Sequence, residues 1–236
     1  MRCSSADLLE GHLLQTVRKE QLKKLNQALI KWEKPLCDAL WTDLHKSAEE
    51  AIMTELSIVS GEIKNHLSHL RCWMKSRRVS TPLKMMPSCS RIVSEPLGCS
   101  LIMSPWNYPV QLLLNPLVGA ISAGCTAVLK PSPYVPTVAK VLEELITECF
   151  NRDYVAIVQG NRDVNTLLLE QRYDLIFFTG SPSLGRTVMS AAAKNMFGTV
   201  PGLMKPELHC RFPEKPAFGE MLVDLCELTA PRICFM

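Results

Sequence analysis

The sequence has no C-x-x-C pair and no large excess of charge of either sign. Its ten cysteines follow no regular spacing. Residues 1–10 contain Arg2, Asp7 and Glu10 and lack the apolar run of a secretory signal. The two observations together predict reduced thiols and a cytoplasmic protein. A net charge of +3 gives no support to nucleic acid or an anionic membrane as a partner.

Charged residues are also missing from the whole stretch between Pro96 and Leu129. A membrane span is one interpretation of so long an uncharged run. Turn and amide residues interrupt the run at Pro105, Asn107, Pro109, Gln111, Asn115 and Pro116. They divide it into pieces of strand and helix length, which favours a buried sheet core over a membrane span.

Residues 6–75 show helical spacing of apolar positions. The pattern predicts amphipathic helices over 6–36, 37–57 and 61–75, each needing a partner surface. On the third helix, His66, His69 and Cys72 follow at steps of three. Three ligands along one straight helix lie too far apart for a single ion, so no metal site is predicted and a partly exposed polar stripe is favoured.

After a loop or short hairpin at 79–96, strands and helices alternate. Strands are predicted at 99–103, 126–129, 154–158 and 175–178, and each is followed by a helix, at 110–123, 137–150, 163–171 and 183–195. Thr137 and Asp163 are the expected N-caps of the second and third of these helices. Four β-α units predict an α/β fold with a parallel, doubly wound sheet.

Asn107 lies in a stiff turn directly after the first of these strands. Pro105 and Pro109 restrict the backbone on either side of it. In an open parallel sheet, ligands bind beyond the carboxyl ends of the strands, where Asn107 would lie. The alternative is a turn asparagine that bonds its own backbone.

Two more strand ends carry candidate residues. The segment Thr179–Gly185 joins a strand to a helix, and free N–H groups at a helix start suit a pyrophosphate. An ordinary capped helix start is the alternative. Lys130 ends another strand, and taken alone it is interpreted as a surface lysine.

Six motifs occur together in one order: Glu95-Pro-Leu-Gly, Pro105-Trp-Asn-Tyr-Pro, Asn115-Pro-Leu-Val-Gly-Ala-Ile-Ser-Ala-Gly, Lys130-Pro-Ser, Phe178-Thr-Gly-Ser and Ala191-Ala-Ala-Lys. In order and spacing they resemble the NAD(P)-dependent aldehyde dehydrogenases, most closely the class 3 (fatty-aldehyde) type. The resemblance extends over residues 94–195 and to the helices from about residue 8. It implies N-terminal helices packed with a Rossmann-like sheet and the oxidation of aldehydes to carboxylic acids.

The resemblance also implies roles for individual residues. Asn107 matches the family's oxyanion residue, whose amide N–H stabilises the charge that develops on the aldehyde oxygen. The cofactor, NAD or NADP, would be bound by Trp106, Lys130, Ser132, Phe178, Thr179, Gly180, Ser181, Gly185 and Val188. The class 3 pattern usually continues Lys-Pro-Ser with Glu, whereas this chain has Pro133, so the choice between NAD and NADP stays open. A small-molecule aldehyde is the implied substrate, and relatives usually form homodimers.

The nucleophile and the base of this chemistry are harder to place. Cys226 is the candidate nucleophile, although an inert structural thiol is the favoured interpretation. Relatives carry an E-L-G-G-K segment after the Ala-Ala-Ala-Lys helix, and no Glu occupies that place here. The expected division is a helical section at 1–80, a dinucleotide-binding core at 81–198 and a divergent, poorly ordered tail at 199–236, with the family's catalytic domain largely missing. The alternative function is a catalytically inactive dinucleotide-binding fragment or pseudoenzyme from a truncated or frameshifted gene.

Overall fold

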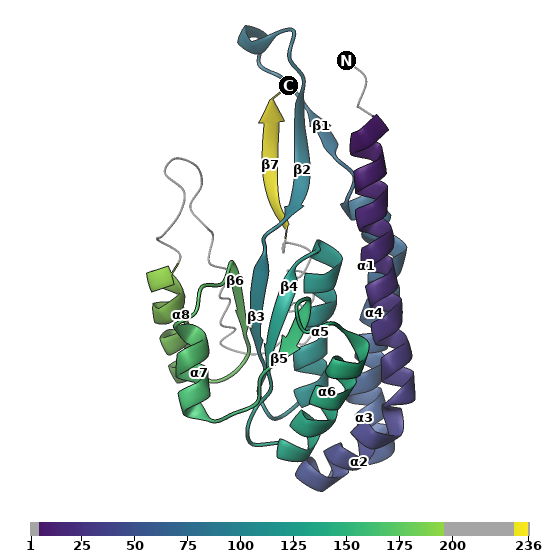
Figure 1. The fold of residues 1–236 in the computed structure, drawn as a ribbon, viewed down its shortest axis with the longest axis vertical. Helices are drawn as coiled ribbons and strands as arrows, with labels where there is room; N and C mark the ends of the chain where they lie inside the picture. Colours follow the sequence, from purple (N-terminus) through teal and green to yellow (C-terminus); the bar gives the residue numbers. More distant parts are fainter. Residues whose placement is uncertain (1–4, 196–228, 236) are drawn as a thin grey trace.

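A parallel sheet with helices on both faces forms the centre of the molecule. The structure, a computed structural model, describes residues 5–195 and 229–235 (Figure 1). The sheet has the strand order β5-β4-β3-β6. Its strands are β3 (Cys99–Met103), β4 (Thr126–Lys130), β5 (Val155–Ile157) and β6 (Leu175–Phe178), and the helices that follow them are α5 (Pro109–Ala123), α6 (Pro136–Cys149), α7 (Arg162–Leu169) and α8 (Pro182–Asn195). The predicted α/β alternation and parallel sheet are therefore confirmed.

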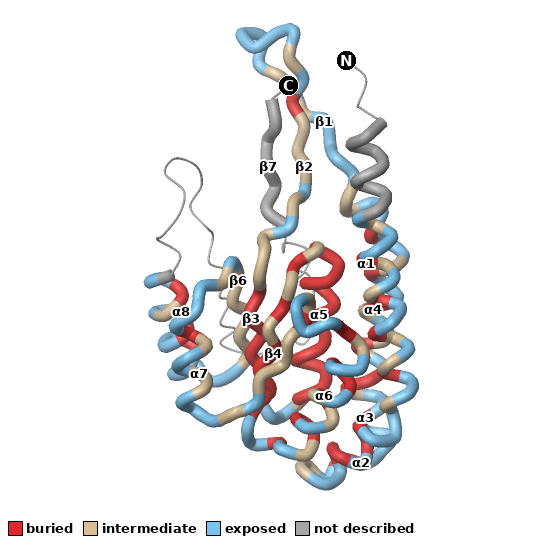
Figure 2. Tube along the Cα trace, in the orientation of Figure 1, coloured by how far each residue is buried: buried red, intermediate tan, exposed pale blue. Residues whose placement is uncertain are grey.

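The side chains of β3 alternate between two apolar clusters, one on each face of the sheet. Ile102 belongs to the large core that the sheet shares with α5, α6 and the N-terminal helices. Leu101 and Met103 point to the other face, where they pack with Leu169 of α7 and Val188 of α8. Figure 2 shows the buried residues concentrated along β3, β4 and α5. The central strand is largely apolar because both of its faces are covered, and its one hydroxyl residue, Ser100, bonds Thr126 O.

The N-terminal helices pack against α5 and α6 on the outside of the large core (Figure 1). They comprise α1 (Ser5–Lys31), α2 (Glu33–Leu44), α3 (Ala48–Ala51), the π-helical turn η1 (Ile52–Leu56) and α4 (Ser57–Trp73). The predicted helix at 37–57 is interrupted between Leu44 and Ala48, where His45 adopts a left-handed conformation with φ of 55°. The interruption changes the direction of the chain before η1 begins.

A small antiparallel sheet extends away from this core (Figure 1). It contains β1 (Arg77–Val79), β2 (Ser90–Pro96) and β7 (Thr229–Phe235), in that order, and the single turn η2 (Leu83–Met85) lies between β1 and β2. The short hairpin expected at 79–96 is present, whereas strand β7 is not predicted from the sequence. The rest of the tail expected at 199–236 lies outside the described residues.

Helix α5 is buried along its whole length, and both of its ends are bonded by charged side chains of the N-terminal helices. At the first turn, Glu55 Oε2 accepts hydrogen bonds from the backbone N–H groups of Val110 and Gln111, at 2.8 and 3.2 Å. At the last turn, Arg18 Nη1 donates to the carbonyl oxygen of Ser122 at 3.1 Å. The carboxylate lies at the positive end of the helix dipole and the guanidinium at the negative end, so both charges stabilise the helix.

Helix α6 is capped in the same way from a distance. Asp43 of α2 accepts a hydrogen bond from Val138 N at 2.9 Å, and the expected cap Thr137 lies inside the helix. Helix α7 is capped by Asn161, whose side chain accepts from Asp163 N at 3.0 Å, so Asp163 was the wrong residue by two positions. Among the described helices, none is long and apolar enough to cross a membrane.

Candidate functional site

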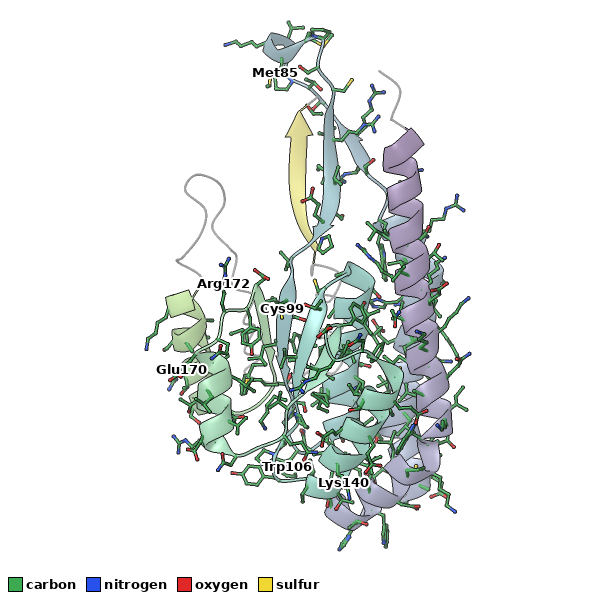
Figure 3. The ribbon with its side chains drawn as sticks, in the orientation of Figure 1. Met85, Cys99, Trp106, Lys140, Glu170 and Arg172 are labelled. Atoms are coloured by element: carbon green, nitrogen blue, oxygen red, sulfur yellow. The ribbon has the colours of Figure 1, made fainter. Side chains whose placement is uncertain are left out.

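Three loops meet at the carboxyl edge of the parallel sheet. They follow β4, β3 and β6, which are neighbours in the sheet. Backbone hydrogen bonds connect them: Ser104 N donates to Lys130 O, and Thr179 N donates to Met103 O, each at 3.1 Å. Trp106, in the middle loop, lies at the opposite end of β3 from Cys99 (Figure 3). This edge is where ligands bind in open α/β sheets.

The loop after β3 presents Trp106 and Asn107 at the surface. Trp106 is 53% exposed and Asn107 is also exposed. Lys46 holds the backbone of this loop, because its Nζ donates a hydrogen bond to Asn107 O at 2.8 Å. The same ammonium lies 4.0 Å from the centre of the Tyr108 ring. A fixed backbone is one part of the preorganisation by which an amide donor can stabilise a developing negative charge.

Lys130, at the end of β4, is buried and not the surface lysine that its sequence alone indicates. Its residue exposure is 2%. Its ammonium donates to Pro131 O at 2.8 Å, the one acceptor that the described part of the chain offers it. Burial lowers the pKa of Lys130 below its ordinary value. A buried ammonium has three donors, so Lys130 has capacity left to bond a ligand hydroxyl.

The loop after β6 leads into the first turn of α8. Ser181 accepts from Gly185 N through its carbonyl oxygen at 2.9 Å and from Leu184 N through its hydroxyl at 3.4 Å. Gly180 lies tightly against Phe178, because a Cβ at this position would come within 2.5 Å of the ring. A side chain at this position would therefore clash with the Phe178 ring.

Of the remaining predicted residues, one lies at this edge, one lies in the apolar cluster behind it, and one lies outside the described residues. Ser132 is buried and its hydroxyl accepts from Tyr134 N at 3.3 Å. Val188 is 1% exposed and forms part of the apolar support beneath the loops. Cys226 lies outside the described residues, so the structure does not place the candidate nucleophile.

Sequence reasoning missed two groups of residues at this edge. One group is the buried side-chain oxygens of Ser104, Gln111 and Asn115, which have no hydrogen-bond partner among the described residues. The other is Lys46 with Glu55, which contact the loop after β3 from the N-terminal helices. Polar residues within the apolar run at 96–129 were a signal for the first group, whereas the second left no local signal.

His66 is the buried member of the stripe that the sequence predicts to be partly exposed. It is 2% exposed and bonds Ser122 Oγ through Nδ1 at 2.6 Å and Glu62 Oε1 through Nε2 at 2.9 Å. The ring therefore joins α4 to α5 inside the core. His69 and Cys72 are exposed.

A comparison with protein families identifies the chain. The profile of the aldehyde dehydrogenase family matches residues 11–201. The chain belongs to the aldehyde dehydrogenase family. A second profile, that of a domain of unknown function, matches residues 185–236.

Curated relatives in the family are similar over most of this chain. It is 44% identical to the 4,4'-diaponeurosporen-aldehyde dehydrogenase of Staphylococcus aureus over 179 residues. This match covers 76% of the chain and 39% of the relative. It is 45% identical to human aldehyde dehydrogenase family 3 member B1, over 76% of the chain and 38% of that protein. The class 3 resemblance is thus confirmed, and the chain spans about two fifths of the length of these relatives.

A solved structure shows the same fold. The substrate-bound AldH of Staphylococcus aureus is 43% identical and superposes with a TM-score of 0.75, over 77% of this chain and 40% of that one. The family fold therefore includes both the N-terminal helices and the parallel sheet described above.

Proposed function

We propose that this chain is an NAD(P)-dependent aldehyde dehydrogenase that oxidises aldehydes to carboxylic acids, and that its described residues form the dinucleotide-binding part. The observation that carries the proposal is the meeting of three loops at one sheet edge, with Asn107, Lys130 and the Thr179–Gly185 turn on adjacent strands. Family membership supplies the reaction class. A cytoplasmic location remains an expectation from the scattered cysteines.

The residues at the edge fit a dinucleotide. The buried Lys130 ammonium has donors to spare for ribose hydroxyls, and its burial makes a further acceptor favourable. At the start of α8, Ser181 already bonds the N–H groups of Leu184 and Gly185, so the backbone N–H groups before them are the candidate donors to a phosphate. When bound, the nicotinamide accepts the hydride in this reaction. Neither Lys130 nor the turn before α8 favours NAD over NADP.

Asn107 would act on the aldehyde itself. Addition of a thiolate to the carbonyl carbon places negative charge on the carbonyl oxygen, and the Asn107 amide donates a hydrogen bond to it. Lys46 already holds the backbone of Asn107, so only the amide side chain has to become ordered when it binds. Cys226 stays the candidate thiol of this chain, and a carboxylate base would complete the chemistry.

Replacement of Asn107 tests this function. In an assay of aldehyde oxidation that follows reduced nicotinamide, Asn107→Ala should lower kcat by about 100- to 1000-fold, because one oxyanion donor is lost. Dinucleotide affinity should be unchanged. The exposed Asn65 of α4 provides the matched control, and Asn65→Ala should retain the full rate.

The wild-type chain decides between the two candidate functions. Turnover that depends on Asn107 supports the enzyme. Saturable dinucleotide binding without any aldehyde turnover would contradict it and support the inactive dinucleotide-binding fragment.

A further inference from the structure

We propose that the buried ion pair of Lys46 and Glu55 is a positioning device that fixes the loop Pro105–Pro109 and thereby directs the Asn107 side chain. The oxyanion role of Asn107 rests on the proposed function above, whereas the fixing of the loop can be tested without it. Neither charged residue would contact the substrate. Both act through the backbone that carries Asn107.

Glu55 holds the end of the loop that enters α5. Its carboxylate is fully buried, and Oε2 accepts from the N–H groups of Val110 and Gln111. The residue before the helix, Tyr108, provides no side-chain cap. The first intrahelical bond of α5 runs from Leu112 N to Tyr108 O, so Glu55 is the acceptor for two N–H groups that the helix itself leaves unbonded.

Lys46 holds the middle of the same loop. Its ammonium bonds Glu55 Oε1 at 2.7 Å and donates to Asn107 O at 2.8 Å. The ammonium also lies over the face of the Tyr108 ring. Lys46 is 8% exposed, so these contacts are formed out of water, where charged hydrogen bonds are strong. The pair therefore bonds the carbonyl group before Tyr108 and the two N–H groups that follow Pro109.

Two local irregularities of the N-terminal helices bring the pair to this place. Lys46 lies in the break that follows the left-handed residue His45, and Glu55 lies in the π-helical turn η1. A continuous α-helix over 37–57 would place residues 46 and 55 on different faces, because nine residues correspond to two and a half turns. Single π-turns of this kind occur frequently at functional sites.

The pair is also a costly way to stabilise a fold. Burial of two charges removes their hydration, and well-packed apolar side chains often stabilise a core equally well. What an apolar pair cannot do is bond a carbonyl and two N–H groups of one loop at the same time. The geometry therefore assigns the pair to the loop and not to the general stability of the core.

The test removes the charges together, because loss of one partner would leave the other charge buried and unpaired. The double variant Lys46→Met/Glu55→Gln keeps the size of both side chains. The matched control is Lys31→Met/Glu148→Gln, which removes an exposed ion pair between α1 and α6 by the same two substitutions. Amide hydrogen exchange is measured residue by residue for all three proteins.

In the Lys46/Glu55 double variant, the amides of Val110 and Gln111 should exchange about tenfold faster or more, since they lose a charged acceptor. The amides of β4 should exchange at the wild-type rate, and the control should match wild type throughout. Unchanged exchange at Val110 and Gln111 would overturn the proposal. Equal acceleration in β4 would overturn it too, because the pair would then serve the whole fold.

A measurement on the wild-type chain covers the case in which the double variant does not fold. The amides of Val110 and Gln111 should exchange as slowly as those of β3, although they lie in the first turn of a helix. Exchange as fast as in an uncapped first turn would contradict the proposal.

The turnover assay separates this inference from the proposed function. The double variant should lower kcat and leave the KM for dinucleotide unchanged, whereas a raised dinucleotide KM with normal kcat would contradict the positioning role. If the wild-type chain shows no turnover while Val110 and Gln111 behave as predicted, the proposed function fails and the fixing of the loop stands.

Discussion

Gly124 ends the buried helix α5 with φ of 84°, a conformation that residues with a side chain rarely adopt. A Cβ there would also come within 2.5 Å of the Arg18 guanidinium, which bonds the last turn of the helix. Gly124→Ala should therefore lower the free energy of unfolding by about 1–3 kcal/mol, from backbone strain and the displaced Arg18. Urea unfolding measures the change.

Gly61 provides the control for this substitution. It lies within α4, and a Cβ at its position would meet nothing within 4 Å. Gly61→Ala should raise the free energy of unfolding by about 0.5–1 kcal/mol, because alanine loses less backbone entropy in a helix. An equal effect at the two glycines would contradict the role given to Arg18.

Two cysteines should differ strongly in reactivity. Cys89 is exposed and lies 3.2 Å from Arg78 Nη2, a contact that lowers the pKa of its thiol. Burial raises the pKa of Cys149 to about 11. Because the thiolate is the reactive form, alkylation near pH 8 should modify Cys89 well before Cys149.

Mass spectrometry of peptides after a short alkylation measures the order. Cys89→Ser should remove the modification, whereas Arg78→Met should slow it and leave Cys149 unaffected. Faster labelling of Cys149 than of Cys89 would contradict the assigned environments.

At the scale of elements, the positions of strands and helices in the sheet could be predicted, but their caps could not. Apolar runs of strand length and proline at Pro109 and Pro136 mark the β-α units locally. The groups that cap α5 and α6 are Glu55 and Asp43, which are 55 and 95 residues away from their partners in the chain. A search for caps next to each helix therefore chose Thr137 wrongly.

The irregular elements escaped prediction for a similar reason. The π-turn η1 and the break after Leu44 keep an ordinary helical pattern of apolar residues. Strand β7 is defined by its pairing with β2, which joins residues more than a hundred positions apart. Tertiary contacts, and not local propensity, determine these elements.

At the scale of the whole molecule, the N-terminal helices contribute residues to the candidate site at the sheet edge, in addition to packing against the sheet. One continuous core joins them to the sheet, and Lys46 and Glu55 carry that connection to the loop of Asn107. The sheet edge and its three loops could be located from the strand pattern and the motifs. The burial of Lys130 could not, because a lysine at a strand end resembles any surface lysine until the neighbouring loops cover it.

The central claim is that this sheet edge binds a nicotinamide dinucleotide, and equilibrium titration of the chain with NAD and with NADP tests it most directly. Calorimetry and tryptophan fluorescence give two independent signals, the second because Trp106 is exposed at the edge. The comparison includes Lys130→Met and, as its control, Lys140→Met, an exposed lysine of α6 (Figure 3). We predict saturable binding of at least one dinucleotide. Lys130→Met should weaken the affinity about tenfold or more, because a charged hydrogen bond is lost. Lys140→Met should leave the affinity unchanged. Absence of saturable binding, or equal affinity in both variants, would contradict the account.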